Sequence, residues 1–173
     1  MKSMKPRLNS KYSEGVYPVQ NKHKYLGDIS KCFYRSSYEL TLFKELDLDP
    51  AVKYWVAEPP QLMVRYYNPL KRRWARYFPD AFCLKEIDGK EFKCIIEVKP
   101  KSKLIKPTPP KIDSNAKTPY VKRMENYQKK LGEYLVIDAK RRACSDFAKL
   151  KGMIYIFITE DTVKAKNRLV NLQ

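Results

Sequence analysis

The chain has 173 residues and carries 36 Lys or Arg against 19 Asp or Glu, which gives a formal net charge of +17 at pH 7. This length predicts one domain, and 43% hydrophobic content excludes an intrinsically disordered chain. The excess positive charge predicts a polyanionic partner. Because no apolar run approaches the roughly 20 residues that span a bilayer, we expect nucleic acid and no membrane. The four cysteines show no CxxC spacing, so we expect neither a zinc site nor a disulfide framework.

Residues 1–33 are polar and basic, and we expect an irregular arm that lies on the domain or on a partner. Residues 34–48 predict a helix, because Ser36 and Glu39 fit the N-cap and N3 positions of a capping box. Glu39 therefore has two interpretations from the residues alone. It either caps its own helix or supplies a third carboxylate to a metal site.

Three strands of an antiparallel meander are predicted next, at 61–67, 73–84 and 91–98, after an extended link at 51–60. The last two strands flank Asp88-Gly89. This dipeptide is typical of a two-residue hairpin turn, because both central positions need a positive φ.

A two-residue turn fixes the register of this hairpin and places Asp80 directly opposite Glu97, with Cβ atoms about 5 Å apart. Two carboxylates at this distance repel unless a cation lies between them, and oxygen ligands favour Mg²⁺ or Mn²⁺ over zinc. Lys99 is two residues from Glu97 and points to the same face of the strand. Pro79 lacks a backbone donor and, by bulging the strand, would shift this register by one residue.

The second half of the chain predicts a loop, two helices and a strand. Residues 100–120 are rich in Pro and Lys and predict a long loop, either a flexible strap over DNA or a disordered insertion. Residues 120–131 and 133–150 predict two helices broken near Gly132. Residues 153–159 are nearly all apolar and predict a parallel strand buried on both faces. The tail from residue 160 is polar.

Basic residues on the loop and the helices are candidates for phosphate contacts, since few acids balance them. They are Lys101 and Lys103 in the loop, Lys122 and Arg123 on the first helix, and Lys140 and Arg141 on the second.

The order helix, meander, helix and strand, with Pro79-Asp80 and Glu97-Val98-Lys99 on the hairpin, resembles the PD-(D/E)xK nuclease core. The resemblance spans roughly residues 24–162 and extends to the head completion nucleases of T-even-type tailed phages. It is carried by four stretches: YRSSYE from Tyr34, RWARYFPD from Arg73, IEVKPK from Ile96 and FITE from Phe157. The end-cleaving transposase subunits share the fold but have QxK where this chain has Glu97-Val98-Lys99.

The resemblance implies a restriction-endonuclease-like α/β fold, with an αβββαβ core and helices that flank a mixed central sheet. It implies a domain at 34–163, preceded by the arm at 1–33 and followed by a tail at 164–173. Asp80 and Glu97 would be metal ligands, Glu39 a further ligand or a support for the bound water, and Lys99 the group that stabilises charge or orients the water. Arg35, Arg73 and Arg76, within the matching stretches, join the DNA-binding candidates.

The implied function is that of a Mg²⁺-dependent DNA endonuclease, with Mn²⁺ as the other suitable ion, which acts in phage head completion after DNA packaging. It would work in the host cytoplasm during assembly or at the head–tail junction of the virion, beside portal or neck proteins. Two alternatives stay open. One is a structural neck protein that retains the nuclease fold and binds the DNA end, and the other is a transposase-type or junction-resolving nuclease.

Overall fold

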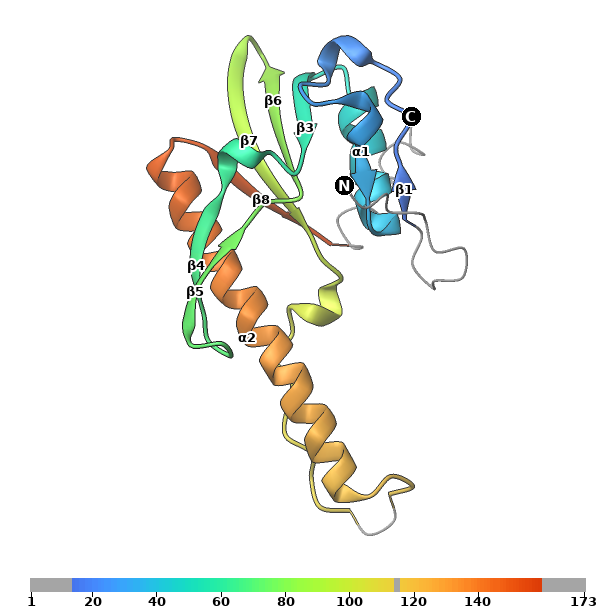
Figure 1. The fold of residues 1–173 in the computed structure, drawn as a ribbon, viewed down its shortest axis with the longest axis vertical. Coiled ribbons are helices and arrows are strands. Elements are labelled where there is room, and N and C mark those ends of the chain that lie inside the picture. Colours follow the sequence, from blue (N-terminus) through green and yellow to red (C-terminus); the bar gives the residue numbers. More distant parts are fainter. Residues whose placement is uncertain (1–13, 114–115, 160–173) are drawn as a thin grey trace, which may run out of the picture.

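The computed structural model describes residues 14–113 and 116–159. A four-stranded sheet with the order β3-β6-β7-β8 forms its centre (Figure 1). The strands are β3 (Val52–Ala57), β6 (Ala81–Ile87), β7 (Lys90–Val98) and β8 (Ile154–Ile158). Of the strand pairs described in this sheet, only β7–β8 is parallel. The mixed sheet and its flanking helices confirm the predicted fold class.

The predicted hairpin register is confirmed in the β6–β7 pair. Cys83 lies opposite Cys94, and the pairing runs without a shift from Ala81 to Ile87. Asp88 and Gly89 form the turn with φ of 51° and 73°, as a two-residue hairpin of this type requires. Pro79 therefore does not displace the register.

The predicted strand 73–84 is wrong as a single element. It divides into β5 (Arg73–Tyr77) and β6, which are separated by residues 78–80. Pro79 in this gap has no backbone N–H for a sheet ladder. Strand β5 pairs with β4 (Val64–Asn68) in a separate two-stranded sheet.

In the predicted meander, residues 61–67 pair with the first strand of the hairpin. In the structure, β3 occupies this position in the sheet. It lies in the segment for which the sequence predicts an extended link, and it pairs with β6 in an antiparallel arrangement. Its register shifts between Val52 and Tyr54, so that the two fully buried residues of the strand, Val52 and Trp55, are three apart. This spacing breaks the alternation by which a strand is recognised in a sequence.

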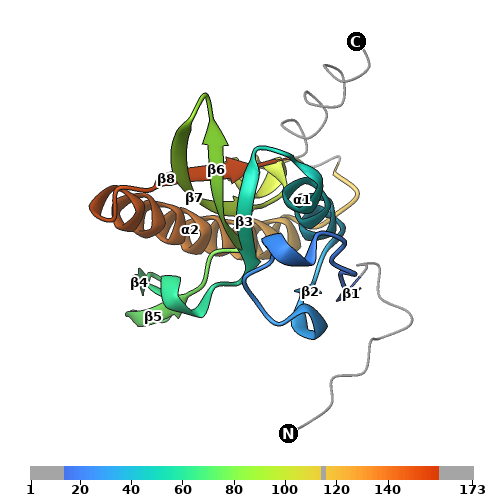
Figure 2. The same cartoon turned by 90° about the horizontal axis from the view of Figure 1, so that it is seen from above.

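The two helices cover opposite faces of the sheet (Figure 2). Ile96 of β7 belongs to a core cluster with three buried residues of α1 (Ser37–Leu48), namely Leu42, Phe43 and Leu46. Its neighbour Ile95 points the other way and packs with Cys144 and Ala148 of α2 (Tyr120–Leu150).

The described part of the predicted arm, residues 14–33, lies on the α1 side of the domain. It holds two short strands and two 3₁₀ helices: β1 (Gly15–Val16), η1 (Lys22–Lys24), η2 (Ile29–Lys31) and β2 (Phe33–Tyr34). Tyr17, Val19, Tyr25 and Cys32 are buried in the same cluster as α1. Asp47 of α1 is fully buried and accepts hydrogen bonds from Tyr17 Oη (2.9 Å) and from the backbone N–H groups of Gln20 and Asn21.

The predicted break at Gly132 is wrong, because α2 is one helix of 31 residues, about 46 Å long. Gly132 is buried where Leu70, from the turn between β4 and β5, packs on the helix. A Cβ at Gly132 would lie 3.2 Å from Leu70 Cδ1. The first half of α2 extends past the sheet (Figure 1). The preceding loop contains only η4 (Lys101–Lys103) among its described residues.

Strand β8 is parallel to β7, as predicted, but it is not buried on both faces. In the described residues it pairs only with β7 and lies at the edge of the sheet, and Ile154 is 45% exposed. The predicted tail at 164–173 and the start of the arm, residues 1–13, lie outside the described residues.

Candidate active site

Three side chains singled out in the sequence meet where β7 ends and β6 begins. Lys99 Nζ lies 2.7 Å from Glu97 Oε1 and 3.3 Å from Asp80 Oδ2, and it donates to the backbone oxygen of Val98 at 3.0 Å. Three oxygens from separate groups therefore surround one ammonium.

Asp80 is held in place by the neighbouring strand. Its Oδ2 accepts a hydrogen bond of 2.8 Å from the N–H of Val98, the residue that follows Glu97. This bond joins the residue before β6 to the last residue of β7. The hairpin register thus sets the distance between the two carboxylates.

Both carboxylates are shielded from water. The side chains of Glu97 and Asp80 are 4% and 14% exposed. Glu97 Oε2 is buried and has no hydrogen-bond partner among the described residues. An unpartnered buried carboxylate oxygen is costly, and a bound cation would satisfy it.

Burial raises the pKa of both Asp80 and Glu97, and the charge of Lys99 opposes this effect in each case. For Lys99, burial lowers the pKa, but the charges of Asp80 and Glu97 outweigh it, so its pKa is raised. The single ammonium of Lys99 thus compensates part of the negative charge of two buried carboxylates. Additional positive charge would stabilise their ionised forms further.

Glu39 lies in the first turn of α1, and its capping interpretation is confirmed. Ser36 Oγ accepts from the Glu39 N–H (3.2 Å), while Glu39 Oε2 accepts from the Arg35 N–H (2.7 Å). Burial raises the pKa of Glu39, and the negative charge of Asp80 adds to the increase. Glu39 therefore belongs to the electrostatic surroundings of the site.

No three acidic, His or Cys side chains in residues 14–113 and 116–159 form a ready cluster for a metal ion. The Glu39 carboxylate is bonded at the start of its own helix, and the Lys99 ammonium lies between the other two carboxylates.

Lys140 of α2, a predicted phosphate contact, lies at this site. Its Nζ is 4.9 Å from the ring centroid of Tyr77 and 5.6 Å from that of Tyr66, the aromatic residues on the inner face of the β4–β5 hairpin. Burial lowers its pKa, and the nearby charge of Glu97 opposes the decrease. Helical periodicity places Lys140 off the apolar stripe, but it could not reveal these partners on β4 and β5.

Glu58 is a further residue at the site that the sequence did not indicate. It forms an ion pair with Arg35, and its N–H donates to the backbone oxygen of Asp80 at 3.0 Å. Its φ is 41°, unusual for a residue other than glycine. The EPP sequence at 58–60 gives no signal for this contact.

The other predicted DNA-binding residues are dispersed. Arg73 and Arg76 are exposed on β5. Lys101 and Lys103 lie on η4, where Lys103 pairs with Glu133. Lys122 and Arg123 lie near the start of α2, and Arg141 pairs with Asp138 at 3.0 Å.

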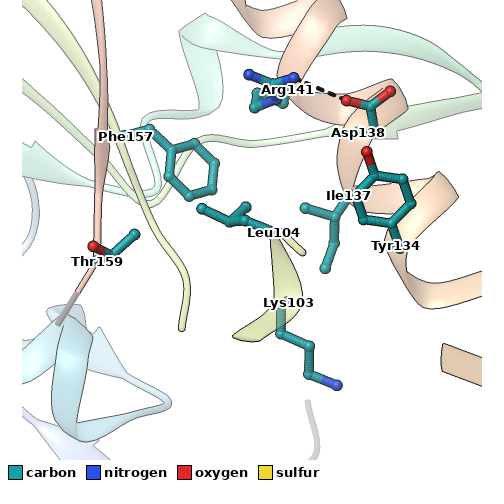
Figure 3. Close-up of a pocket in the computed structure, with 8 residues that line it drawn as sticks. All are labelled: Lys103, Leu104, Tyr134, Ile137, Asp138, Arg141, Phe157 and Thr159. Carbon is teal, nitrogen blue, oxygen red and sulfur yellow. Dashed lines mark hydrogen bonds and ion pairs between the residues drawn. The ribbon is translucent and has the colours of Figure 1, made fainter. Parts of the chain in front are cut away.

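A cavity of about 240 Å³ opens between η4, α2 and β8 (Figure 3). Its lining mixes aromatic, aliphatic and charged side chains: Lys103, Leu104, Tyr134, Ile137, Asp138, Arg141, Phe157 and Thr159. Phe157 lies opposite Glu97 in the β7–β8 register, so the cavity adjoins the strand that carries the candidate site.

A mixed sheet between two helices, with paired carboxylates and an ammonium at the end of a hairpin, is the architecture of an endonuclease domain. Residues 49–160 match the family described as TnsA-like endonuclease N terminal, and the chain belongs to this family. It is 30% identical, over 151 residues, to the Head completion nuclease of Enterobacteria phage T4. The aligned region covers 87% of this chain and 93% of that protein.

These matches confirm the resemblance to nucleases that the sequence motifs indicated, and they support a nuclease role. No solved structure matches the chain. Within the described residues, no helix combines the length and the apolar character needed to cross a membrane.

Proposed function

We propose that this protein is a metal-dependent DNA endonuclease of the PD-(D/E)xK type that acts in phage head completion. The observation that carries the proposal is the convergence of Asp80 Oδ2, Glu97 Oε1 and the Val98 carbonyl oxygen on a single cation, the Lys99 ammonium. The unpartnered Oε2 of Glu97 adds a fourth oxygen. Such a set of oxygen donors suits Mg²⁺ or Mn²⁺ and not zinc.

In this mechanism Asp80 and Glu97 would hold the ion, with the Val98 carbonyl beside them. When bound, the ion supplies a water of lowered pKa and neutralises charge on the phosphate. Lys99 orients the attacking water or stabilises the charge that develops on the phosphate oxygens. Glu39, whose pKa is raised in part by the negative charge of Asp80, would be a further ligand of the ion or would support the attacking water.

The remaining residues of the site position these groups. The Val98 N–H fixes Asp80 against β7, and Glu58, which pairs with Arg35, donates its N–H to the backbone oxygen of Asp80. The positive charge of Lys140 acts on Glu97 and counters the effect of burial on the pKa of Glu97. We propose DNA as the substrate, because the chain carries a net charge of +17 and belongs to an endonuclease family.

The place of action is proposed from the relative alone, the Head completion nuclease of Enterobacteria phage T4. By this analogy the protein acts in the host cytoplasm during assembly or at the head–tail junction, next to portal or neck proteins.

The test is digestion of linear and supercoiled DNA with Mg²⁺, Mn²⁺ or EDTA, by the wild type and by Asp80→Ala and Glu97→Gln. We expect cutting that needs the ion and that both substitutions abolish. The matched control is Asp146→Ala, an exposed acid on α2. DNA binding without cutting under any ion would contradict the proposal and favour a structural neck protein, for which capsid co-purification is the next measurement.

A further inference from the structure

The outward face of the β4–β5 hairpin carries two arginines and two large aromatic residues. In the register of this hairpin, Arg65 lies opposite Arg76 and Tyr67 lies opposite Trp74. All four side chains are exposed, whereas Tyr66 and Tyr77 on the inner face are buried. We call these four residues the hairpin platform.

The aromatic side chains of the platform form an ordered pair. Trp74 is 61% exposed and Tyr67 is 49% exposed. Their ring centroids are 6.0 Å apart in an edge-to-face arrangement, and the Arg65 guanidinium lies 5.6 Å from the centroid of the Trp74 ring. Much of the surface of both rings is thus open to a ligand.

Packing against the core does not explain why this outward face of the hairpin carries two large aromatic residues. The inner side of the hairpin already packs on α2 (Figure 1). Leu70, in the turn of the hairpin, lies over Gly132. Arg65 and Arg76 lie directly opposite each other, and like charges so placed destabilise a strand pair, yet among the described residues neither arginine forms an ion pair with an acid. Exposed aromatic rings and uncompensated arginines both match a ligand that is anionic and has flat aromatic faces.

We propose that the hairpin platform binds unpaired bases of single-stranded DNA. Bases stack on exposed aromatic side chains, and the arginines contact the adjoining phosphates. Base faces are already stacked inside a duplex, so the platform distinguishes a single strand from a blunt duplex. This inference rests on the proposed nuclease function and names its substrate class, DNA with a single-stranded segment beside the cut.

The position of the platform agrees with this role. Trp74 precedes Asp80 by six residues, which span at most about 20 Å of extended chain. The buried side of the same hairpin supplies Tyr66 and Tyr77, which contact the Lys140 side chain at the site. A single strand lying on the platform is therefore within a few nucleotides of the carboxylates.

Tryptophan fluorescence tests binding without cutting. The chain has two tryptophans, and Trp55 is fully buried, so a ligand that stacks on the surface changes the emission of Trp74. With EDTA present, a 12-nucleotide oligothymidylate is expected to quench the fluorescence to saturation. A blunt duplex of the same length is expected to quench it weakly. Equal quenching by both would overturn the proposal.

Anisotropy of a labelled oligothymidylate measures the contribution of the platform. Trp74→Ala is expected to weaken single-strand binding roughly 5- to 100-fold and duplex binding less than about 2-fold. Trp74→Phe keeps an aromatic ring and should recover most of the affinity. Tyr54→Ala, which removes a 45% exposed tyrosine from β3, is the matched control and should change neither affinity. Unchanged single-strand binding by Trp74→Ala would contradict the proposal.

Different results would contradict the nuclease proposal and the platform proposal. If the oligonucleotide quenches Trp74 but no ion supports cutting, the nuclease proposal is wrong and the platform stands. If the wild type cuts DNA in an ion-dependent way but Trp74→Ala binds single strands like the wild type, the platform is wrong and the nuclease stands.

Discussion

The Lys99 ammonium lies 2.7 Å from Oε1 of Glu97, a carboxylate whose side chain is 4% exposed. In this position the ammonium occupies the place between Glu97 and Asp80 where the proposed function puts a metal ion. The stability of the metal-free protein and the affinity for the ion are therefore coupled through one side chain.

Glu97→Gln should stabilise the metal-free protein. Burial raises the pKa of Glu97 despite the opposing charge of Lys99, so the ionised side chain costs free energy in the folded state at neutral pH. We expect the variant to gain on the order of 1 kcal/mol in free energy of unfolding at pH 7.5. The difference should vanish as the pH falls below 4.5, the ordinary pKa of Glu, because the wild type is then protonated both folded and unfolded.

Urea unfolding of both proteins in EDTA, at neutral and at acidic pH, measures this difference. A variant that is less stable than the wild type at neutral pH would show that the Lys99 ion pair outweighs burial.

Lys99→Met should destabilise the metal-free protein and increase its response to Mg²⁺. Removal of the ammonium takes away the nearest compensating charge of two buried carboxylates, which we expect to cost about 3 kcal/mol of unfolding free energy. An added divalent ion would then raise the thermal midpoint more in the variant than in the wild type.

Lys85→Met is the control for this experiment. It also removes a partly buried ion pair, that with Asp49 at 2.7 Å, but at a distant position in β6. Its loss of stability should not respond to Mg²⁺. If Mg²⁺ stabilises the wild type and Lys99→Met equally, the ammonium does not occupy the ion's place.

Glu39→Gln separates the two roles of Glu39. The glutamine retains an oxygen that accepts from the Arg35 N–H but carries no charge. We expect its unfolding free energy to stay within about 0.5 kcal/mol of the wild type. We expect DNA cutting to fall roughly 10- to 100-fold, because the attacking water loses a charged support. Ser36→Ala, which removes the N-cap, should instead cost about 1 kcal/mol of stability. Wild-type cutting by Glu39→Gln would show that Glu39 only caps α1.

Gly132→Ala should stabilise the protein by up to about 1 kcal/mol, since alanine is the better helix former. The new Cβ would lie 3.2 Å from Leu70 Cδ1, but Leu70 is 60% exposed in a turn and can move aside. Gly89→Ala is the matched substitution with the opposite expected sign, because Gly89 has a φ of 73°. Thermal unfolding of both variants measures the effects, and a less stable Gly132→Ala would mean that the turn holds Leu70 rigidly.

Asp47→Ala should release the segment at 17–21 from α1. Asp47 is fully buried and accepts from Tyr17 Oη at 2.9 Å and from Gln20 N at 2.7 Å. Its removal leaves these donors without a partner, so we expect a loss of about 3 kcal/mol in unfolding free energy and faster proteolysis near residue 20. Asp146→Ala, at an exposed position, should change stability by less than about 0.5 kcal/mol. Proteolysis at the wild-type rate would contradict the anchoring role.

Local chemistry makes the hairpin and the first helix predictable. The Asp88-Gly89 dipeptide determines a turn type and hence the register from Ile87 back to Ala81, and this register brings Asp80, the residue before β6, close to the end of β7. Ser36 and Glu39 fix the start of α1 in the same way. In these elements the determining interactions lie within a few residues of each other in the sequence.

The wrong and missing predictions concern contacts between distant segments. Gly132 is compatible with a continuous helix because Leu70, 62 residues earlier, packs where a side chain would project. The contacts of Glu58 with Arg35 and of Lys140 with Tyr77 likewise depend on how β3, α2 and the β4–β5 hairpin assemble. Periodicity in a single segment carries no information about such partners.

The parallel pairing of β7 with β8 has a consequence for synthesis of the chain. Phe157, opposite Glu97, lies 60 residues later in the sequence, and the Lys99 N–H donates to the backbone oxygen of Ile158 at 3.1 Å. A ribosome adds residues at about 5–20 per second, so roughly 3 to 12 seconds pass between the synthesis of Glu97 and the synthesis of Phe157 opposite it. Strand β7, which carries Glu97 and directly precedes Lys99, thus gains its parallel partner only after the whole of α2 has been synthesised, so the proposed metal site is assembled late relative to its own strand.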